Sequence, residues 1–401
     1  MPLTNTSDRF GTVSKSFHWL TAIGILVLLP LGLIANDMPY ETSEQLADKA
    51  WMFSLHKTVG VMVFLIALAR IAWALSQPDP GPLHPARAAE TLAADTVHWL
   101  LYGSLVLVPL SGWISHAAAS GFAPIWWPLG QDLPLVHKSE TTAALFGGAH
   151  RVLTRVLALA LLLHVAATLK HHAIDKDATL RRMWFGGTTA PVTARAHSHA
   201  RPAALALVIW AVALAVGAAL GAYAPDGNAR PAAAPEPLRS EWRVREGTLA
   251  ITVTQLGSEV TGQFADWTAS IGFDETTETG LAGTVEVTIA IGSLRLGAFT
   301  GQAMGPDYFN GRDFPTATFR ADIVAVVDGF EAQGTVTIRD RSIPLTLPFG
   351  LSIDGDSAWM TAGTTLDRRD FGIGDNMADE SSLKFRVAVD IDLMATRAGD
   401  R

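Results

Sequence analysis

The stretch "GGAHRVLTRVLALALLLHVAAT", residues 147–168, is an apolar run that approaches the length of a membrane helix, and yet it contains two histidines. His150 and His164 are fourteen residues apart. On an α-helix that spacing is an advance of about 21 Å and nearly four whole turns, so both rings lie on one face, one near each side of a bilayer. Titratable groups inside a membrane are costly and usually face the interior of a helix bundle. This run therefore predicts a functional site at each of two depths in the membrane.

Five apolar runs of this kind fill the first part of the chain, at residues 19–35, 59–75, 99–114, 145–169 and 203–223. A span needs about 20 apolar residues, and flanking Trp, His and small residues complete the shorter runs. The first run is not expected to be a cleaved signal, because it lacks a small-residue cleavage site and further spans follow it. The sequence therefore predicts a multi-pass protein in a lipid bilayer.

Charge and histidine are divided unequally along the chain. Residues 1–223 contain 15 Lys and Arg against 12 Asp and Glu, whereas residues 224–401 contain 15 against 26. All 12 histidines lie at or before His199, and there is no cysteine, which excludes disulfides, iron–sulfur clusters and thiol nucleophiles. A net charge of −8 without a basic block argues against a nucleic-acid partner.

Lysine and arginine set the expected orientation. They gather in the N-terminal tail and in the segment 170–201, which includes Arg195, whereas the loop 34–55 is acidic. Basic short loops stay in the cytoplasm, so the N-terminus and this segment are expected there. Five spans then place the C-terminal part in the periplasm, and the membrane would be the bacterial inner membrane.

Paired histidines at matching depths indicate haem. A neutral imidazole is a strong axial ligand of haem iron. His18 and His164 lie toward the cytoplasmic side and are expected to share one haem, while His56 and His150 lie toward the outer side and are expected to share another. His98, also at the cytoplasmic side, is an alternative ligand there or lines a nearby site.

Two arginines lie within the apolar runs, Arg70 and Arg155. An unpaired buried charge is costly, so each is expected either to pair with a haem propionate or to extend to the membrane surface. The other histidines fall in predicted loops and are expected at the surface: His84, His116, His137, His171, His172, His197 and His199.

The helical part resembles a known family. The segments "SKSFHWLTAIGILVLLPLGL" (14–33), "LHKTVGVMVFLIALARIAW" (55–73), "HWLLYGSLVLVPLSGW" (98–113) and "AHRVLTRVLALALLLHVAATLKHHAIDKDATLRRM" (149–183) look like the four helices of bacterial cytochrome b561. The resemblance covers residues 9–185. It implies a four-helix bundle with two b-type haems, and the positions that match the ligand motifs are His18, His56, His150 and His164.

The same resemblance implies a function. Family members pass electrons between a donor or acceptor at one face and the membrane quinone pool, and superoxide oxidation coupled to ubiquinone reduction is one activity it allows. Members are also similar to the cytochrome b subunits of hydrogenases, so the periplasmic donor or acceptor stays open. The span 203–223, which follows a cytoplasmic loop at 186–202, is not needed by a four-helix core and is interpreted as a tether.

A soluble domain is expected after the spans. Residues 224–241 are rich in Pro and Ala and predict an extended linker. Beyond them the apolar pattern has a period of two, as in "TVEVTIAIGSL", which places Val285, Val287, Ile289 and Ile291 on one face. Short alternating strands between Gly, Asp and Asn turns predict an antiparallel sandwich or barrel.

This domain resembles the YceI-like family of lipocalin-like barrels, most specifically in "MGPDYFNGRDFPTATFRA" (304–321), and the predicted domain covers 242–395. The resemblance implies an eight-stranded barrel that holds a polyisoprenoid such as ubiquinone. Charged residues 367–370 are expected to form a solvated ion-pair cluster. The candidate lipid-lining side chains are Phe264, Phe273, Phe309, Phe319 and Phe371.

The preferred hypothesis is an electron-transferring membrane cytochrome with a periplasmic lipid-binding barrel. One alternative is an isoprenoid carrier or sensor that the bundle anchors, and another is the membrane subunit of a larger oxidoreductase. Paired intramembrane histidines favour the first hypothesis, because an anchor has no need of them.

Overall fold

The computed structural model describes residues 2–398 apart from 82, 85, 120–122, 127, 129, 131, 186–199, 225–239 and 328. The chain divides into a helical unit within residues 1–225 and an all-β unit that lies mainly after residue 225. Most of the predicted loop 186–202 and linker 224–241 lies outside the described residues, as do Arg195, His197 and His199.

Five long helices make up the helical unit, and all five are long and apolar enough to cross a membrane. Their bounds are α1 Thr12–Asp37, α2 Ser43–Leu75, α3 Ala88–Ala118, α4 Glu140–Lys170 and α6 Ala200–Ala219. The π-helical turn η1, His171–Asp175, and the short α5, Thr179–Met183, follow α4. The predicted five spans are therefore confirmed as helices, and the first four extend beyond the apolar runs at one or both ends.

Local signals fix where two of these helices begin and end. α4 begins at Glu140 because the Ser139 Oγ accepts a hydrogen bond from the Thr142 amide, a favourable N-cap. α6 ends at Ala219, before the predicted limit of the span, because Gly221 adopts a positive φ of 73°. The Ala222 amide then bonds to the Gly217 carbonyl at 2.9 Å, as in a glycine-terminated helix.

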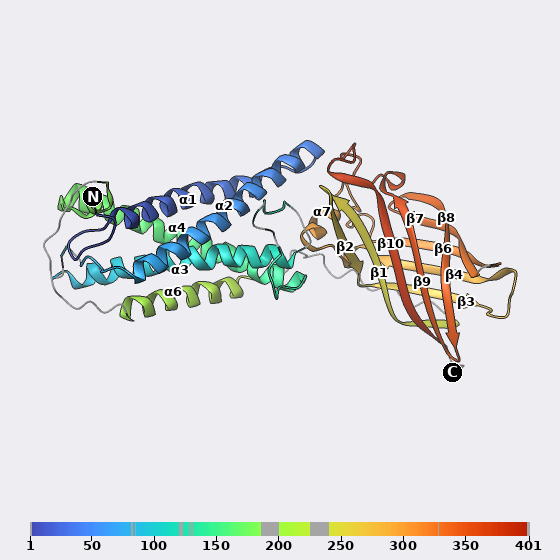
Figure 1. Ribbon diagram of the computed structural model, residues 1–401. Helices are drawn as coiled ribbons and strands as arrows, with labels where there is room; N and C mark the ends of the chain where they lie inside the picture. The colour runs from blue at the N-terminus through green and yellow to red at the C-terminus, as the bar shows by residue number, and fades with distance from the viewer. Residues whose placement is uncertain are drawn as a thin grey trace. The chain divides into compact units, whose positions relative to one another are not determined.

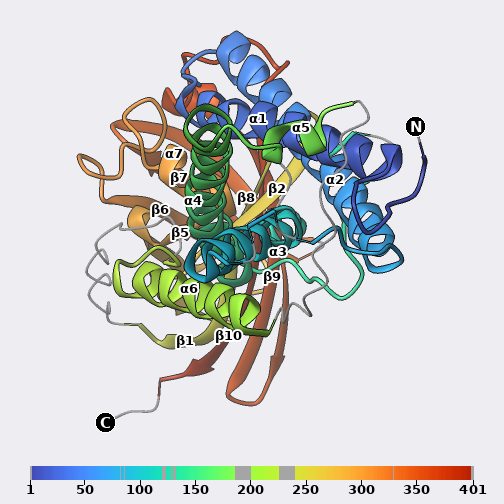
Figure 2. The ribbon, with the colours of Figure 1, turned by 90° about the vertical axis from the view of Figure 1, so that its left-hand side faces the viewer.

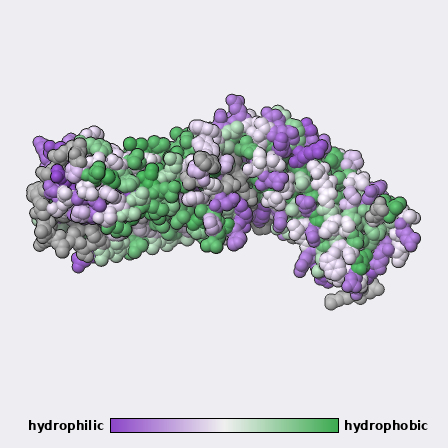
Figure 3. Space-filling model, viewed as in Figure 1, coloured by the Kyte–Doolittle hydropathy of each residue, from purple (hydrophilic) through white to green (hydrophobic). Residues whose placement is uncertain are grey.

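The outer surface of the helices is apolar. Figure 3 shows green over much of the middle of the visible face of the helical unit. Large apolar side chains of the helices are more than half exposed, for example Leu26 of α1 and Leu162 of α4. Helices that are apolar on all sides are typical of membrane spans, where the outward side chains contact lipid.

The fifth helix, α6, packs on the bundle and is more than the tether that the sequence indicated. It runs beside α3 and α4 (Figures 1 and 2). Its Trp210 is only 9% exposed, and the indole Nε1 lies 3.4 Å from the Ser104 Oγ. A Cβ at Gly103 would come within 2.0 Å of the Trp210 ring, so this glycine makes room for the tryptophan.

Eight strands form a closed antiparallel barrel in the all-β unit, and β10 pairs with β1 along its whole length (Figure 1). In ring order they are β1 Trp242–Gln255, β3 Trp267–Phe273, β4 Gly280–Ala290, β6 Thr316–Val326, β7 Gly329–Ile338, β8 Arg341–Asp354, β9 Ser357–Asp367 and β10 Leu383–Arg397. The ring closes where Trp242 of β1 pairs with Ile271 of β3. The predicted lipocalin-like barrel is confirmed.

Two further strands extend the sheet beside the second half of β1. β2 Ser258–Phe264 pairs with β1, and the short β5 Leu294–Arg295 pairs with β2. The four apolar side chains of β4 and its end that were predicted to share a face all line the barrel interior. Alternation along a strand sends successive side chains to opposite faces, which is why the period-two pattern identified the inward positions.

Candidate functional site

The outer pair of predicted histidines meets inside the bundle. The ring centres of His56 on α2 and His150 on α4 are 6.4 Å apart. The His150 Nδ1 lies 2.8 Å from the Val108 carbonyl oxygen on α3. A carbonyl only accepts hydrogen bonds, so Nδ1 carries the proton and Nε2 keeps its lone pair, the state in which imidazole binds a metal.

Glycines on the facing helices make room for these two rings. A Cβ at Gly32 of α1 would lie 2.8 Å from His56 Cε1, and a Cβ at Gly112 of α3 would lie 2.8 Å from His150 Nδ1. Real Cβ atoms do not approach other atoms so closely, so either substitution would displace a ring. The backbone of α1 and α3 therefore holds the outer pair in place.

Three histidines gather at the inner end. The ring centres of His18 and His164 are 6.2 Å apart, and those of His98 and His164 are 5.4 Å apart. Arg70 of α2 accompanies them: its Nη1 donates to the Thr21 Oγ1 at 2.5 Å and its guanidinium covers the Tyr102 ring. The inner end thus combines imidazole ligands with one cation, which suits a haem and its anionic propionates.

The ring separations discriminate between these pairs. Two imidazoles that bind one metal ion from opposite sides, as a haem would require, would have ring centres about 6.4 Å apart, because each metal–nitrogen bond is about 2 Å and each nitrogen lies about 1.2 Å from its ring centre. The pairs His56–His150 and His18–His164 match this separation. His98–His164 is about 1 Å too close, so the geometry favours His18 as the inner partner.

Other residues that the sequence analysis singled out do not lie beside the histidine pairs. Arg155 is exposed on α4, away from the bundle interior. His116 is not a surface loop residue, as the sequence indicated, but is buried near the end of α3 with its Nδ1 3.2 Å from the Lys57 Nζ. His137 and His172 are exposed, as predicted.

The prediction that His171 is a surface residue is also wrong. It begins the π-helical turn η1 and is only 16% exposed, beside the Asp177 carboxylate and the ring of His84. Burial alone would raise the pKa of Asp177, but hydrogen bonds from Thr179 and from the two imidazoles hold that pKa well below its ordinary value. This carboxylate is therefore ionised near neutral pH.

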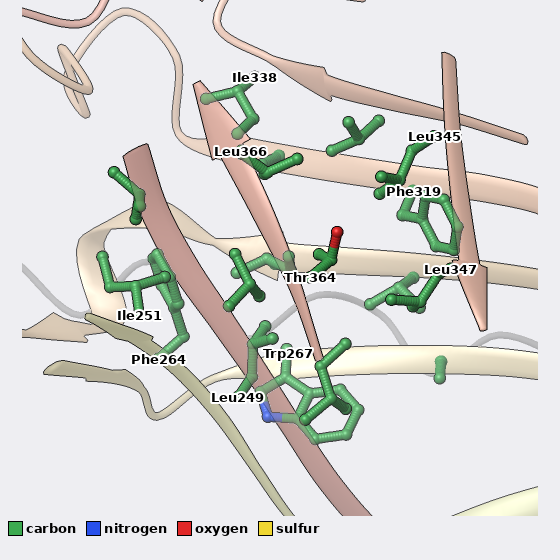
Figure 4. Close-up of a pocket in the computed structure, with 18 of the residues that line it drawn as sticks. Leu249, Ile251, Phe264, Trp267, Phe319, Ile338, Leu345, Leu347, Thr364 and Leu366 are labelled. Atoms are coloured by element: carbon green, nitrogen blue, oxygen red, sulfur yellow. The ribbon is translucent and has the colours of Figure 1, made fainter. Parts of the chain in front are cut away.

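The barrel encloses an apolar cavity of about 280 Å³. All five phenylalanines that the sequence singled out line it, together with aliphatic side chains from every strand of the ring. Figure 4 shows Leu249, Trp267 and Leu347 projecting into this space from different strands. Phe264 and Phe309 meet edge to face across 6.2 Å. An elongated apolar ligand fits such an interior.

A polar group interrupts the apolar lining of the cavity. Arg368 lines it and is 3% exposed, so the prediction that it belongs to a solvated ion-pair cluster is wrong, whereas Asp367 and Arg369 do form an exposed ion pair. Tyr308 and Gln302 also line the cavity, and the Gln302 amide donates to the Tyr308 hydroxyl at 2.8 Å. Burial raises the pKa of Tyr308, so its hydroxyl stays protonated.

The Arg368 guanidinium is held by main-chain carbonyls. It donates to the carbonyl oxygens of Ile373, Gly374, Met377, Leu383 and Lys384. Sequence reasoning missed this residue because four charged residues in a row resemble a surface segment. The signal was available only from the short 3₁₀ turn η4, Arg368–Phe371, which turns one arginine inward and its neighbour outward.

Each of the two units matches a known protein family. Residues 9–186 match the family described as "Prokaryotic cytochrome b561", and residues 242–395 match the "YceI-like domain". Among curated proteins, the chain is 34% identical over 188 residues to "Cytochrome b561 homolog 2" of Escherichia coli (strain K12), which covers 46% of this chain and 95% of that protein. It is 24% identical over 177 residues to "Probable superoxide oxidase CybB" of Yersinia pestis, covering 44% and 95%.

Among solved structures, the barrel is similar to a polyisoprenoid binding domain from Saccharophagus degradans, at 12% identity and a TM-score of 0.32, covering 40% of this chain and all of that one. The family assignment of the helical part rests on its sequence identity to a relative that it covers almost completely. The assignment of the barrel rests on its match to the YceI-like domain. The chain belongs to the prokaryotic cytochrome b561 family, as a multi-pass membrane protein that carries a YceI-like domain after its helices.

Proposed function

We propose that this protein is a membrane cytochrome with two b-type haems that carries electrons across the bilayer to or from quinone. The observation that carries the proposal is the pair of histidine couples, each with the ring separation of two imidazoles on one metal ion. Because His150 and His164 share one face of α4, the two couples lie about 21 Å apart along that helix. Such a spacing connects the two sides of a membrane.

The chain's own residues hold and orient the two groups. His56 and His150 would ligate the outer haem, and His18 and His164 the inner one. The Val108 carbonyl fixes the tautomer of His150, and Arg70 supplies positive charge for propionates at the inner end. Haem b, when bound, supplies one-electron redox chemistry.

We further propose the inner membrane, a cytoplasmic N-terminus and a periplasmic barrel, which the basic segment after α4 supports. A periplasmic donor such as superoxide is proposed because of the similarity to the Yersinia pestis protein. His98 lies beside the inner couple without matching its ring separation, so we assign it to a quinone position near the inner haem.

The barrel is proposed to bind the isoprenoid chain of a quinone or a related lipid. Its cavity is lined by apolar side chains over most of its length, and Tyr308, Gln302 and Arg368 place polar groups in that lining. An amphiphile with an oxygen-bearing head suits this combination, because buried polar groups need partners.

A haem count and a reduced-minus-oxidised spectrum of the full-length protein test the proposal. We expect two low-spin b-type haems per chain, with His56→Ala and His164→Ala each retaining one and His137→Ala, at an exposed position, retaining both. A haem-free protein from haem-supplied cells would contradict electron transfer. It would leave the alternative of an anchored isoprenoid carrier, which the barrel cavity favours.

A further inference from the structure

A second cluster of metal-ligating side chains lies beyond the inner histidines, where η1 follows α4. His84, from the α2–α3 connection, and His171, from η1, both face the carboxylate of Asp177. The His84 Nε2 is 3.0 Å and the His171 Nδ1 is 2.7 Å from the same Asp177 Oδ2. The two imidazole planes are nearly parallel, at 8°, and their ring centres are 6.3 Å apart.

Charge balance distinguishes this cluster from the carboxylates beside it. Glu90 and Asp175 also contact His171, but both already have cations: Lys170 bonds to each of them and Arg87 lies 3.2 Å from Glu90 and 3.3 Å from Asp175. A lysine ammonium therefore occupies the neighbouring cation position.

Among the residues that the structure describes, Asp177 has no such cation, because its ion-pair partners are the two imidazoles and no lysine or arginine. Its side chain is only 11% exposed, and its Oδ1 accepts from the Thr179 amide at 2.8 Å, which leaves Oδ2 for the imidazoles. A buried carboxylate needs a compensating positive charge.

We propose that His84, His171 and Asp177 bind a divalent transition-metal ion such as Zn²⁺. The three donor atoms lie within 4.8 Å of one another. Zinc bonds of about 2.0–2.1 Å to imidazole and carboxylate place neighbouring donors about 3.3 Å apart. The separations of 3.0 Å and 2.7 Å between the Asp177 Oδ2 and the two imidazole nitrogens are close to that value. His84 is 39% exposed, which gives an ion a route from solvent and leaves a coordination position for water.

The local backbone supports the arrangement. In η1 the residues wind more widely than in an α-helix, and the turn ends at Lys176 in the left-handed conformation, with a φ of 55°. The Asp177 amide donates to the His171 carbonyl at 3.1 Å, which closes the loop between the two ligands. π-Helical turns of this kind are frequent at functional sites.

Zinc retention by the purified, tag-free, full-length holoprotein tests the site. After chelator treatment, the protein is dialysed against Zn²⁺ and the bound metal is measured by elemental analysis, with haem iron as the internal count of chains. We expect about one tightly held zinc per chain, and at least about tenfold weaker binding in His84→Ala and Asp177→Asn. His172→Ala removes an exposed imidazole next to the site and is expected to bind zinc like the wild type.

An unchanged haem spectrum in each variant shows that the bundle is folded, since none of these residues belongs to a haem couple. Equal zinc retention by the wild type and Asp177→Asn would overturn the proposal, because the metal would then be held without this carboxylate. Loss of binding in His172→Ala as large as in His84→Ala would also overturn it, because the metal would then be held by other histidines.

Discussion

Main-chain groups and small residues beside the imidazole rings determine how these rings are oriented. His150 receives its orientation from a carbonyl on α3, and its space from a glycine one turn further along that helix. Neither group would bind the metal itself, yet both determine where the Nε2 lone pair of His150 points. Groups that orient metal ligands in this way typically change metal affinity by 10- to 100-fold when they are lost.

Gly112→Ala tests this at the outer couple. The new Cβ would lie 2.8 Å from the His150 Nδ1, so the ring must move and its bond to Val108 weakens. We expect the outer haem to dissociate about tenfold more readily, measured as haem transfer to apomyoglobin. Leu107→Ala, at a lipid-facing position of α3, is the control and is expected to lose haem like the wild type.

Arg368 and Arg369 are adjacent and differ in burial, so they form a matched pair for stability. Arg368→Ala removes the guanidinium donor of five main-chain carbonyls, of which the Gly374 carbonyl still accepts from the Met377 amide, and we expect a loss of about 3 kcal/mol or more in barrel stability. Arg369→Ala breaks an exposed ion pair with Asp367 and should cost less than about 1 kcal/mol. Denaturant unfolding followed by near-ultraviolet circular dichroism measures both, and equal losses would contradict the assigned role of Arg368.

At the scale of elements, α6 closes the groove between α3 and α4. Trp210 fills the space above Gly103 and Ser104, while the Tyr223 hydroxyl donates to the Leu214 carbonyl at 2.8 Å and the Arg151 guanidinium to the Ala222 carbonyl at 3.0 Å. These contacts fix the end of the helix from which the all-β part continues. In lipid, close packing and buried hydrogen bonds hold helices together, because apolar surface alone gives no preference for protein over lipid.

Trp210→Ala should therefore loosen the bundle even though it touches no histidine. We expect the temperature at which haem is released to fall by several degrees, about 3 °C or more, because the cavity left by the indole costs packing energy. Leu207→Ala, on the same helix and 64% exposed, is the control and should leave that temperature unchanged. A fall of the same size in both variants would argue against a packed α6.

At the scale of the whole molecule, one chain joins a cytochrome b561-type helix bundle to a barrel with an apolar cavity. Both units belong to one chain, so a lipid bound in the barrel would be present wherever the bundle is. Tethering raises the effective concentration of one binding module near another without any new contact. If the barrel supplies quinone, blocking its interior should slow turnover while leaving the haem sites intact.

Ala332→Phe tests this coupling. Ala332 is 3% exposed and lines the cavity, so a phenyl ring there would fill part of the lipid position. We expect less co-purifying isoprenoid lipid by mass spectrometry and a several-fold slower quinone-linked haem oxidation at limiting quinone. Haem content should not change. Val327→Phe, at a position 97% exposed, is the control, and equal rates in both variants would argue against a supply role for the barrel.

The sequence by itself determined the five spans and the period-two barrel strands, because these follow from local periodicity and from the length of a bilayer crossing. The five phenylalanines of the cavity were named from the resemblance to a lipid-binding barrel, and Phe309 and Phe371 lie outside the strands. The sequence also brought the two histidine couples within reach, since fourteen residues on one helix fix both face and depth. It could not show that Arg368 is buried or that His171 is partly shielded, because their exposure depends on a 3₁₀ turn and a π-helical turn that no sequence pattern predicted. Only the tertiary structure places the ring centres of His18 and His98 at 6.2 Å and 5.4 Å from that of His164, packs α6 through Trp210, and brings His84 beside Asp177. Those contacts join segments far apart in the chain, and their distances depend on how whole helices pack.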